Sequence, residues 1–204
     1  VAIEQGSNSL FGATENSQAL TELAKAGFSA VEAIDALRGT TNLAITSNLG
    51  MAQSADVIAK IMRQYGLQAK DAGRITDVLT VAAFKTTTNV ENLANAFKFV
   101  GPAANSLNIS VEETAAVLGL MAQRGIEASL AGTSLRRMLF ELGAPTKEAK
   151  DRLALLGLTV EDVNPKMSSL GKVLAKLRDH HMALADAQKI FDQRTAVTAL
   201  AVTQ

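Results

Sequence analysis

Three short stretches of the sequence decide the fold: Gly27-Phe28-Ser29-Ala30-Val31-Glu32, Asn108-Ile109-Ser110-Val111-Glu112-Glu113 and Gly157-Leu158-Thr159-Val160-Glu161-Asp162. Each begins with a glycine or asparagine, which favours the left-handed backbone that ends a helix, and the following apolar residue packs back on that helix. The serine or threonine and the acid three residues after it are typical of a capping box, which starts the next helix. Each stretch therefore predicts a joint at which one helix ends and another begins within about three residues.

Weaker versions of this joint recur along the chain. Gly66-Leu67-Gln68-Ala69-Lys70-Asp71 is one, in which glutamine is a poor capping residue. Gly125-Ile126 and Gly143-Ala144-Pro145 are typical of further helix ends, and Thr88-Asn89-Val90-Glu91 of a further helix start. The joints lie roughly 40 residues apart at first, an interval found in helical-repeat arrays. The later spacing breaks down, so the sequence does not predict strict repetition.

Apolar residues recur in steps of three and four almost everywhere, which predicts amphipathic helices, and no sustained alternation typical of strands is present. We expect an all-α fold, an array or bundle of about ten to twelve short helices joined by capped turns. Pro102 should kink or split its helix because proline lacks the N–H group. The helices are predicted near residues 15–26, 29–37, 41–48, 50–65, 69–85, 89–106, 110–124, 127–142, 146–156, 167–179, 182–193 and 195–204.

Composition excludes several classes of protein. The 204 residues include no cysteine, which excludes disulfide scaffolds, cysteine-bound zinc, iron–sulfur clusters and thiol nucleophiles. Lysine and arginine balance aspartate and glutamate at 20 each, so the net charge of zero disfavours nucleic-acid binding by a general basic field. Alanine-rich apolar content indicates helices that approach one another closely.

The chain opens on Val1-Ala2-Ile3-Glu4-Gln5-Gly6, without an initiator methionine or the charged and apolar regions of a secretory signal. Its last residues resemble the middle of a helix. We therefore expect a fragment of a longer polypeptide that forms a single helical module over residues 1–204, with a sub-boundary near 39–50 and a loop at 157–167. No stretch predicts a transmembrane helix, because the longest uncharged run, 39–55, is rich in polar residues.

Two polar motifs invite a catalytic or metal-binding interpretation. Ser169-Leu170-Gly171-Lys172 fits the S-x-x-K pattern of a lysine-activated serine, but the companion motifs S-D-N and K-T-G are missing. His180-His181 lacks the third ligand and the helical spacing of a zinc site. Exposed positions at helix ends explain both motifs more simply.

The remaining chemical candidates also favour ordinary helix faces. Arg124, Arg136 and Arg137 are interspersed with acids, which indicates solvated surfaces, and Phe97, Phe99 and Phe140 lie on apolar helix faces that predict core packing. The sequence therefore predicts no enzyme, no catalytic residue, no metal site and no cofactor.

One family resemblance is carried by a succession of segments in a fixed order, and it covers about residues 20–204. The chain resembles the shared helical domain of phage tail tape measure proteins. The segments that carry the resemblance are Ala24-Lys25-Ala26-Gly27-Phe28-Ser29-Ala30, Gly66-Leu67, Asp71-Ala72, Thr76-Asp77-Val78-Leu79, Phe97-Lys98-Phe99-Val100-Gly101-Pro102-Ala103-Ala104, Ile109-Ser110-Val111-Glu112-Glu113-Thr114-Ala115-Ala116, Gly132-Thr133-Ser134-Leu135-Arg136 and Ala144-Pro145-Thr146-Lys147-Glu148-Ala149.

The resemblance implies a structural protein of the virion that sets tail length during assembly, occupies the lumen of the tail tube and leaves ahead of the DNA. It implies tail tube subunits, tail tip or baseplate proteins and tail assembly chaperones as partners, a homo-oligomer, proximity to DNA in the tail, and residence in the host cytoplasm during assembly. It brings no catalytic residues. Departures from the family pattern at Gln68, Asp192 and the loop 162–166 put local turns in doubt.

Two alternatives remain open from the sequence. One is a host adaptor or scaffold that binds a partner helix in an alanine- and leucine-lined groove. The other is a DNA-binding channel protein, which requires a basic face despite the zero net charge. In the tape measure interpretation, capped joints every few turns predict a folded module, with the length-proportional rod elsewhere in the polypeptide.

Overall fold

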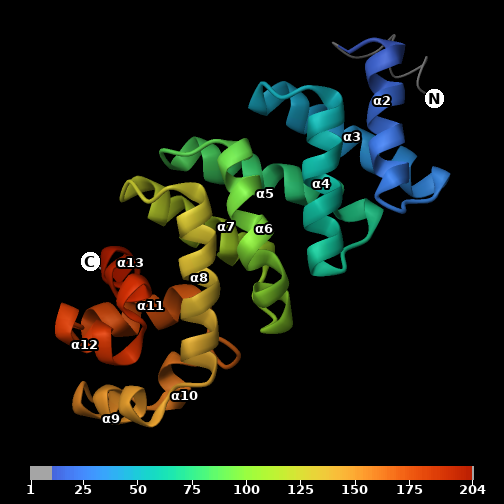
Figure 1. Ribbon diagram of the computed structural model, residues 1–204. Coiled ribbons are helices and arrows are strands. Elements are labelled where there is room, and N and C mark those ends of the chain that lie inside the picture. The colour runs from blue at the N-terminus through green and yellow to red at the C-terminus, as the bar shows by residue number, and fades with distance from the viewer. Residues whose placement is uncertain (1–10, 204) are drawn as a thin grey trace. The chain divides into compact units, whose positions relative to one another are not determined.

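The computed structural model describes residues 11–203, and this part of the chain is all-α, as expected (Figure 1). The prediction for residues 1–10, a polar opening without a secretory signal, lies outside the described residues. Within the described part the helices are α2 (Ala13–Lys25), α3 (Ala30–Ser47), α4 (Met51–Tyr65), the 3₁₀ helix η1 (Ala69–Asp71), α5 (Ala72–Lys85), α6 (Val90–Ser106), α7 (Val111–Gln123), α8 (Ala128–Gly143), α9 (Lys147–Leu155), α10 (Val160–Val163), α11 (Leu170–Asp179), α12 (Leu184–Ile190) and α13 (Gln193–Thr203).

The predicted joints end and start helices as expected. At the first joint Gly27 has φ 91°, and Phe28 N–H donates to the Leu23 carbonyl at 3.2 Å, which closes the end of α2. Ser29 then caps α3, because its backbone N–H donates to the Glu32 carboxylate at 2.8 Å and its hydroxyl accepts from Glu32 N–H. Asn108 takes the same left-handed backbone, with φ 59°. These contacts satisfy backbone groups that a helix end otherwise leaves unpaired.

Two sequence-based expectations for the helices were wrong, and a third is tested only in part. The separate helices predicted at 29–37 and 41–48 are one helix, α3, which continues through Gly39. Pro102 does not split α6, and a kink at this residue stays a prediction. The stretch 157–167, expected as a loop, contains the short helix α10, whose capping box joins Thr159 and Asp162.

The contacts between residues divide the chain into two compact units, residues 1–84 and 85–204. In the first unit α2 packs on α4, and α3 packs on η1. In the second unit α6 packs on α8, and α13 contacts α7, α8, α11 and α12. This clustering describes where packing is dense; the single helical module with a sub-boundary near 39–50 stays a prediction.

The first helices of the chain follow a repeat that the sequence only suggested. The helices α2, α4, α6 and α8 begin at Ala13, Met51, Val90 and Ala128, which lie 38, 39 and 38 residues apart. We call these the A helices. The helix after each of the first three, namely α3, the η1–α5 segment and α7, is its B helix. The N-cap positions of the B helices are Ser29, Gln68 and Ser110, which lie 39 and 42 residues apart. Three helix pairs therefore succeed one another at a nearly constant interval, and the order changes after α8.

Small residues allow helices of successive pairs to touch through their backbones. In the second unit, a Cβ atom at Gly132 of α8 would lie 2.2 Å from the Ala96 carbonyl oxygen of α6. In the first unit, a Cβ at Gly39 of α3 would lie 2.8 Å from the backbone carbon of Ala72, and the Thr76 hydroxyl donates to the Gly39 carbonyl at 2.8 Å. Such approaches exclude any side chain, so these glycines fix the distance between neighbouring helices.

Replacing Gly132 with alanine should destabilise the protein by about 2 kcal/mol or more, because the new methyl group collides with backbone that cannot rotate away. The matched control is Gly171→Ala in α11, where the new Cβ meets no atom within 4 Å. There the free energy of unfolding should rise by about 0.5 kcal/mol through helix propensity. Urea denaturation followed by circular dichroism measures both variants, and equal stabilities would contradict the close contact.

Candidate functional site

The polar motifs singled out in the sequence lie at helix ends. Ser169 is the residue before α11, and Lys172 is exposed in its first turn. The ring nitrogen Nδ1 of His180 lies 2.7 Å from the Leu156 carbonyl oxygen, and His181 ends the helix with φ 54°. Among residues 11–203 no group of three histidine, aspartate or glutamate side chains could hold a metal ion. The structure therefore assembles no reaction centre from these motifs.

The aromatic prediction was correct for one residue and wrong for two. Phe97 is fully buried in α6, whereas Phe99 is 38% exposed and Phe140 is 52% exposed. Of the three arginines, Arg137 donates to Asp192 at 3.0 Å, Arg124 is the C-cap residue of α7, and Arg136 is half-buried on α8. The three arginines thus have different surroundings, and Phe99 and Phe140 are exposed at the surface.

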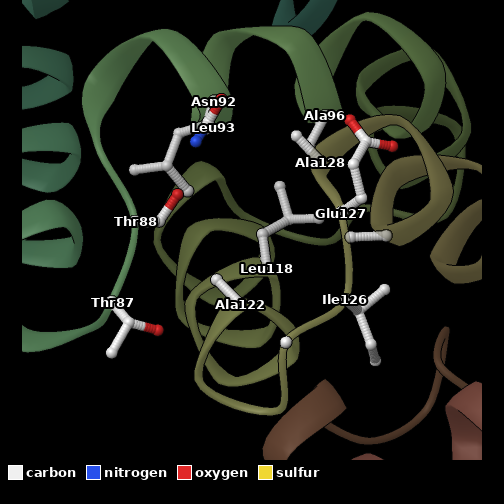
Figure 2. A pocket seen from close by; sticks show the side chains of 12 residues that line it. Thr87, Thr88, Asn92, Leu93, Ala96, Leu118, Ala122, Ile126, Glu127 and Ala128 are labelled. Carbon is white, nitrogen blue, oxygen red and sulfur yellow. The ribbon is translucent and has the colours of Figure 1, made fainter.

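A pocket of about 220 Å³ lies in the second unit, where α6 begins and α7 ends (Figure 2). Its wall combines apolar and polar side chains from α6, α7 and the loops before α6 and α8. The lining residues are Thr87, Thr88, Asn92, Leu93, Ala96, Leu118, Ala122, Gly125, Ile126, Glu127, Ala128 and Ala131. This pocket is large enough for one side chain or a few water molecules.

Glu127 gives the pocket a negative rim. Its carboxylate accepts from the backbone N–H groups of Ser129 at 3.0 Å and Leu130 at 3.2 Å, and thereby caps α8. The Ser129 hydroxyl and these N–H groups lower the pKa of Glu127, since each hydrogen bond favours the charged form. The carboxylate is therefore already engaged in starting α8.

The register of the repeat distinguishes one residue of the pocket wall. The residue two positions before the first residue of an A helix is Phe11 for α2, Leu49 for α4 and Ile126 for α8. An apolar residue at this place packs against the first turns of its helix as a hydrophobic staple. In α6 the corresponding residue is Thr88, which lines the pocket. The pocket thus lies where a larger apolar side chain would pack.

A second pocket of about 370 Å³ lies between α7, α11 and α13. Its wall is more apolar, with Leu120 of α7, Leu174 of α11 and Val202 of α13, and Arg178 at its edge. Glu113, which caps α7, also accepts from Leu170 N–H at 3.0 Å and so joins α7 to the start of α11. Sequence reasoning missed both pockets, because they depend on which helices meet.

Ion pairs fasten the last helices of the second unit. The Asp186 carboxylate of α12 is buried, and it accepts from the Arg152 guanidinium of α9 and from Ala183 N–H at 2.7 Å. Near the start of α13, Asp192 pairs with Arg137, and its N–H lies 3.4 Å from a Glu141 carboxylate oxygen. Burial raises the pKa of Glu141, and the neighbouring negative charge of Asp192 adds to the effect.

In comparisons with known proteins, residues 2–200 match the sequence model of a family described as "Phage-related minor tail protein". The chain is 37% identical over 188 residues to the "Tape measure protein" of Pneumococcus phage Dp-1, an alignment that covers 92% of this chain and 16% of that protein. It is 30% identical over 178 residues to the "Probable tape measure protein" of Escherichia phage P2, covering 87% of this chain and 22% of that protein. The chain thus spans less than a quarter of either relative. No solved structure matches it.

Filling the first pocket should stabilise the protein. Thr88→Ile adds the apolar side chain that α8 has at the same place, so the free energy of unfolding should rise by about 1 kcal/mol. Thr14→Ile, at an exposed position of α2, makes the same chemical change in solvent and should stay within about 0.5 kcal/mol of the original. Thermal denaturation of the two variants measures the difference in stability. If Thr88→Ile is no more stable than the control, an apolar side chain at position 88 does not fill the pocket.

The raised pKa of Glu141 predicts that the stability difference between Glu141→Gln and the original protein depends on pH. A carboxyl whose pKa is raised in the folded state favours folding in its protonated form, and this contribution is lost as the pH rises through the raised pKa. Glu141→Gln mimics the protonated form, so it should be more stable than the original at pH 7 and equally stable near pH 3.5. Urea denaturation at the two pH values measures the difference. An equal effect of Glu141→Gln on the free energy of unfolding at both pH values would contradict the raised pKa of Glu141.

Proposed function

We propose that this chain, which belongs to the phage-related minor tail protein family and is similar to tape measure proteins of two phages, is a folded helical-repeat segment of a tape measure protein. The protein is a phage tail component, and the resemblance found from the sequence is confirmed. The proposal adds that the whole polypeptide sets tail length during assembly, lies in the lumen of the tail tube and leaves ahead of the DNA. The family match over residues 2–200 carries this assignment.

The packing of the helix pairs supports a specific role for this segment within the tape measure protein. A continuous helix advances about 1.5 Å per residue, so 38 residues would measure about 57 Å. Packed neighbouring helices lie only about 10 Å apart, so within a unit the next pair follows at about that distance. The pairs beginning at Ala13 and Val90 are each followed by an A helix packed on the first. This segment therefore adds little length per residue while folded, and the length-proportional part lies elsewhere in the polypeptide.

The proposed partners are other components of the tail. We assign to the whole polypeptide contacts with tube subunits, with tail tip or baseplate proteins and, before the tail is complete, with assembly chaperones in the host cytoplasm. Exposed apolar side chains such as Phe84 and Leu155 offer this segment contact points for such proteins. None of the helices within residues 11–203 combines the length and apolar character that crossing a membrane requires.

Tail length in phage that carries insertions tests the proposal. One variant inserts a second copy of residues 51–89, one helix pair, after Asn89 in the tape measure gene. The matched variant inserts a straight helical sequence of the same length at the same place. The extra pair should lengthen the tail by about 10 Å, and the straight helix by about 58 Å.

Electron micrographs of purified virions measure the mean tail length of each phage. Equal lengthening by about 58 Å in both would mean that the segment is extended in the tail, which contradicts the folded module. Unchanged tails in both would contradict a contribution of this segment to length. The first of these results tests whether the segment is folded in the tail, and the second tests whether the segment contributes to tail length.

A further inference from the structure

The pocket at the start of α6 has an apolar floor and a polar rim. Leu93 of α6 and Leu118 of α7 are buried and form its floor, whereas Thr87, Asn92 and Glu127 are exposed at its mouth. In Figure 2 the Leu118 side chain lies between the loop before α6 and Glu127, which comes from the loop before α8. A ligand that fits this pocket must therefore combine an apolar portion with a polar end.

The polar groups of the rim are free to bind a ligand. Within residues 11–203, the hydroxyls of Thr87 and Thr88 and the side-chain amide of Asn92 make no hydrogen bond to the protein. Each of these side chains has an oxygen that can accept a hydrogen bond. Among the lining residues, only Glu127 carries a charge. The rim thus offers several acceptor oxygens and one carboxylate.

The Glu127 carboxylate has room for a further donor. Its Oε2 accepts from the Ser129 hydroxyl, from Ser129 N–H and from Leu130 N–H, whereas its Oε1 accepts only from Ser129 N–H, at 3.0 Å. A carboxylate has about four lone-pair sites, so Oε1 can accept another hydrogen bond. The bonds to α8 also hold the carboxylate in one orientation, which lowers the entropic cost of binding.

The charge of Glu127 is not balanced by a basic side chain. No lysine or arginine within residues 11–203 forms an ion pair with it, and the exposed Arg124, three residues earlier, is no exception. The hydrogen bonds from Ser129 and Leu130 lower the pKa of Glu127, so it is charged at neutral pH. The helix dipole at the start of α8 offsets about half of one charge. A net negative charge remains at the rim and favours a cationic ligand.

Arginine is the side chain that matches both parts of the pocket. Lysine and arginine bury an aliphatic stem on apolar surface while they keep a charged end in polar surroundings. The volume of about 220 Å³ is enough for one such side chain. Arginine has five N–H donors in a planar fork, whereas lysine has three on one atom, so arginine can bond to several oxygens around the rim at once.

We propose that this pocket is a docking site for an arginine side chain of another protein. The aliphatic stem of that arginine lies on Leu93 and Leu118, and its guanidinium donates to Oε1 of Glu127 and to the free oxygens of the rim. Arginine residues are enriched among the side chains that anchor protein interfaces. The inference rests on the pocket and its charge, and it is independent of the proposed role in setting tail length.

Nuclear magnetic resonance of the ¹⁵N-labelled 204-residue chain tests the proposal with three small probes. N-acetylargininamide should shift the backbone signals of Asn92, Ile126 and Glu127 in a saturable way, with a dissociation constant of about 1–10 mM. N-acetylcitrullinamide has nearly the same shape without the charge, and should bind about threefold or more weakly. N-acetyllysinamide should bind about twofold or more weakly, because it lacks the planar fork.

Two variants with matched controls assign the binding to the pocket. Thr88→Ile fills the pocket and should abolish the saturable shifts, whereas Thr14→Ile, at an exposed position of α2, should bind like the original. Glu127→Gln removes the charge and should weaken binding about threefold. Glu32→Gln makes the same change at the capping carboxylate of α3, outside the pocket, and should leave binding unchanged. Circular dichroism verifies that each variant is folded.

Four outcomes would overturn the proposal. The first is the absence of saturable shifts at the lining residues with N-acetylargininamide. The second is undiminished binding of this probe by Thr88→Ile, which would locate the probe outside the pocket. The third is equal binding of the citrulline probe, which would exclude a role for charge, and the fourth is equal binding of the lysine probe, which would exclude selection of the guanidinium.

Discussion

Each helix of this chain must satisfy the backbone groups at its ends within the few residues that separate it from the next helix. The sequence does this with a left-handed glycine or asparagine followed directly by a capping residue, as at Gly27-Phe28-Ser29. Because the joints are so short, the end of one helix lies close to the start of the next, and each helix packs on near neighbours. Helix length, the interval of the repeat and the position of both pockets all depend on where these joints stand.

The joints are also the part of the fold that the sequence predicts well, since their chemistry is local. The failure at Gly39 shows the limit of local reasoning. Glycine and two threonines predict a break in α3, yet the helix continues, because the missing side chain lets Ala72 approach and Thr76 donates to the Gly39 carbonyl. A contact with a residue more than 30 positions away overrides helix propensity.

The surface was harder to predict for a related reason. Helical periodicity identifies apolar positions, but which of them are covered depends on the neighbouring helix, so Phe97 is buried and Phe99 is exposed on the same helix. The pocket at Thr88 became interpretable only from the register of the repeat, because threonine before a helix is unremarkable in itself. The positions of Ser169 and His180 near the ends of α11 agree with the helix-end placement that their spacing predicted.

Stability in such a chain is a sum of local contributions, because each pair contacts mainly its neighbours. Close backbone contacts at Gly39 and Gly132 occur beside fully buried large side chains such as Leu135, so both kinds of contact hold neighbouring helices together. Within each unit, the contacts of α2 with α4 and of α6 with α8 are therefore a main source of order.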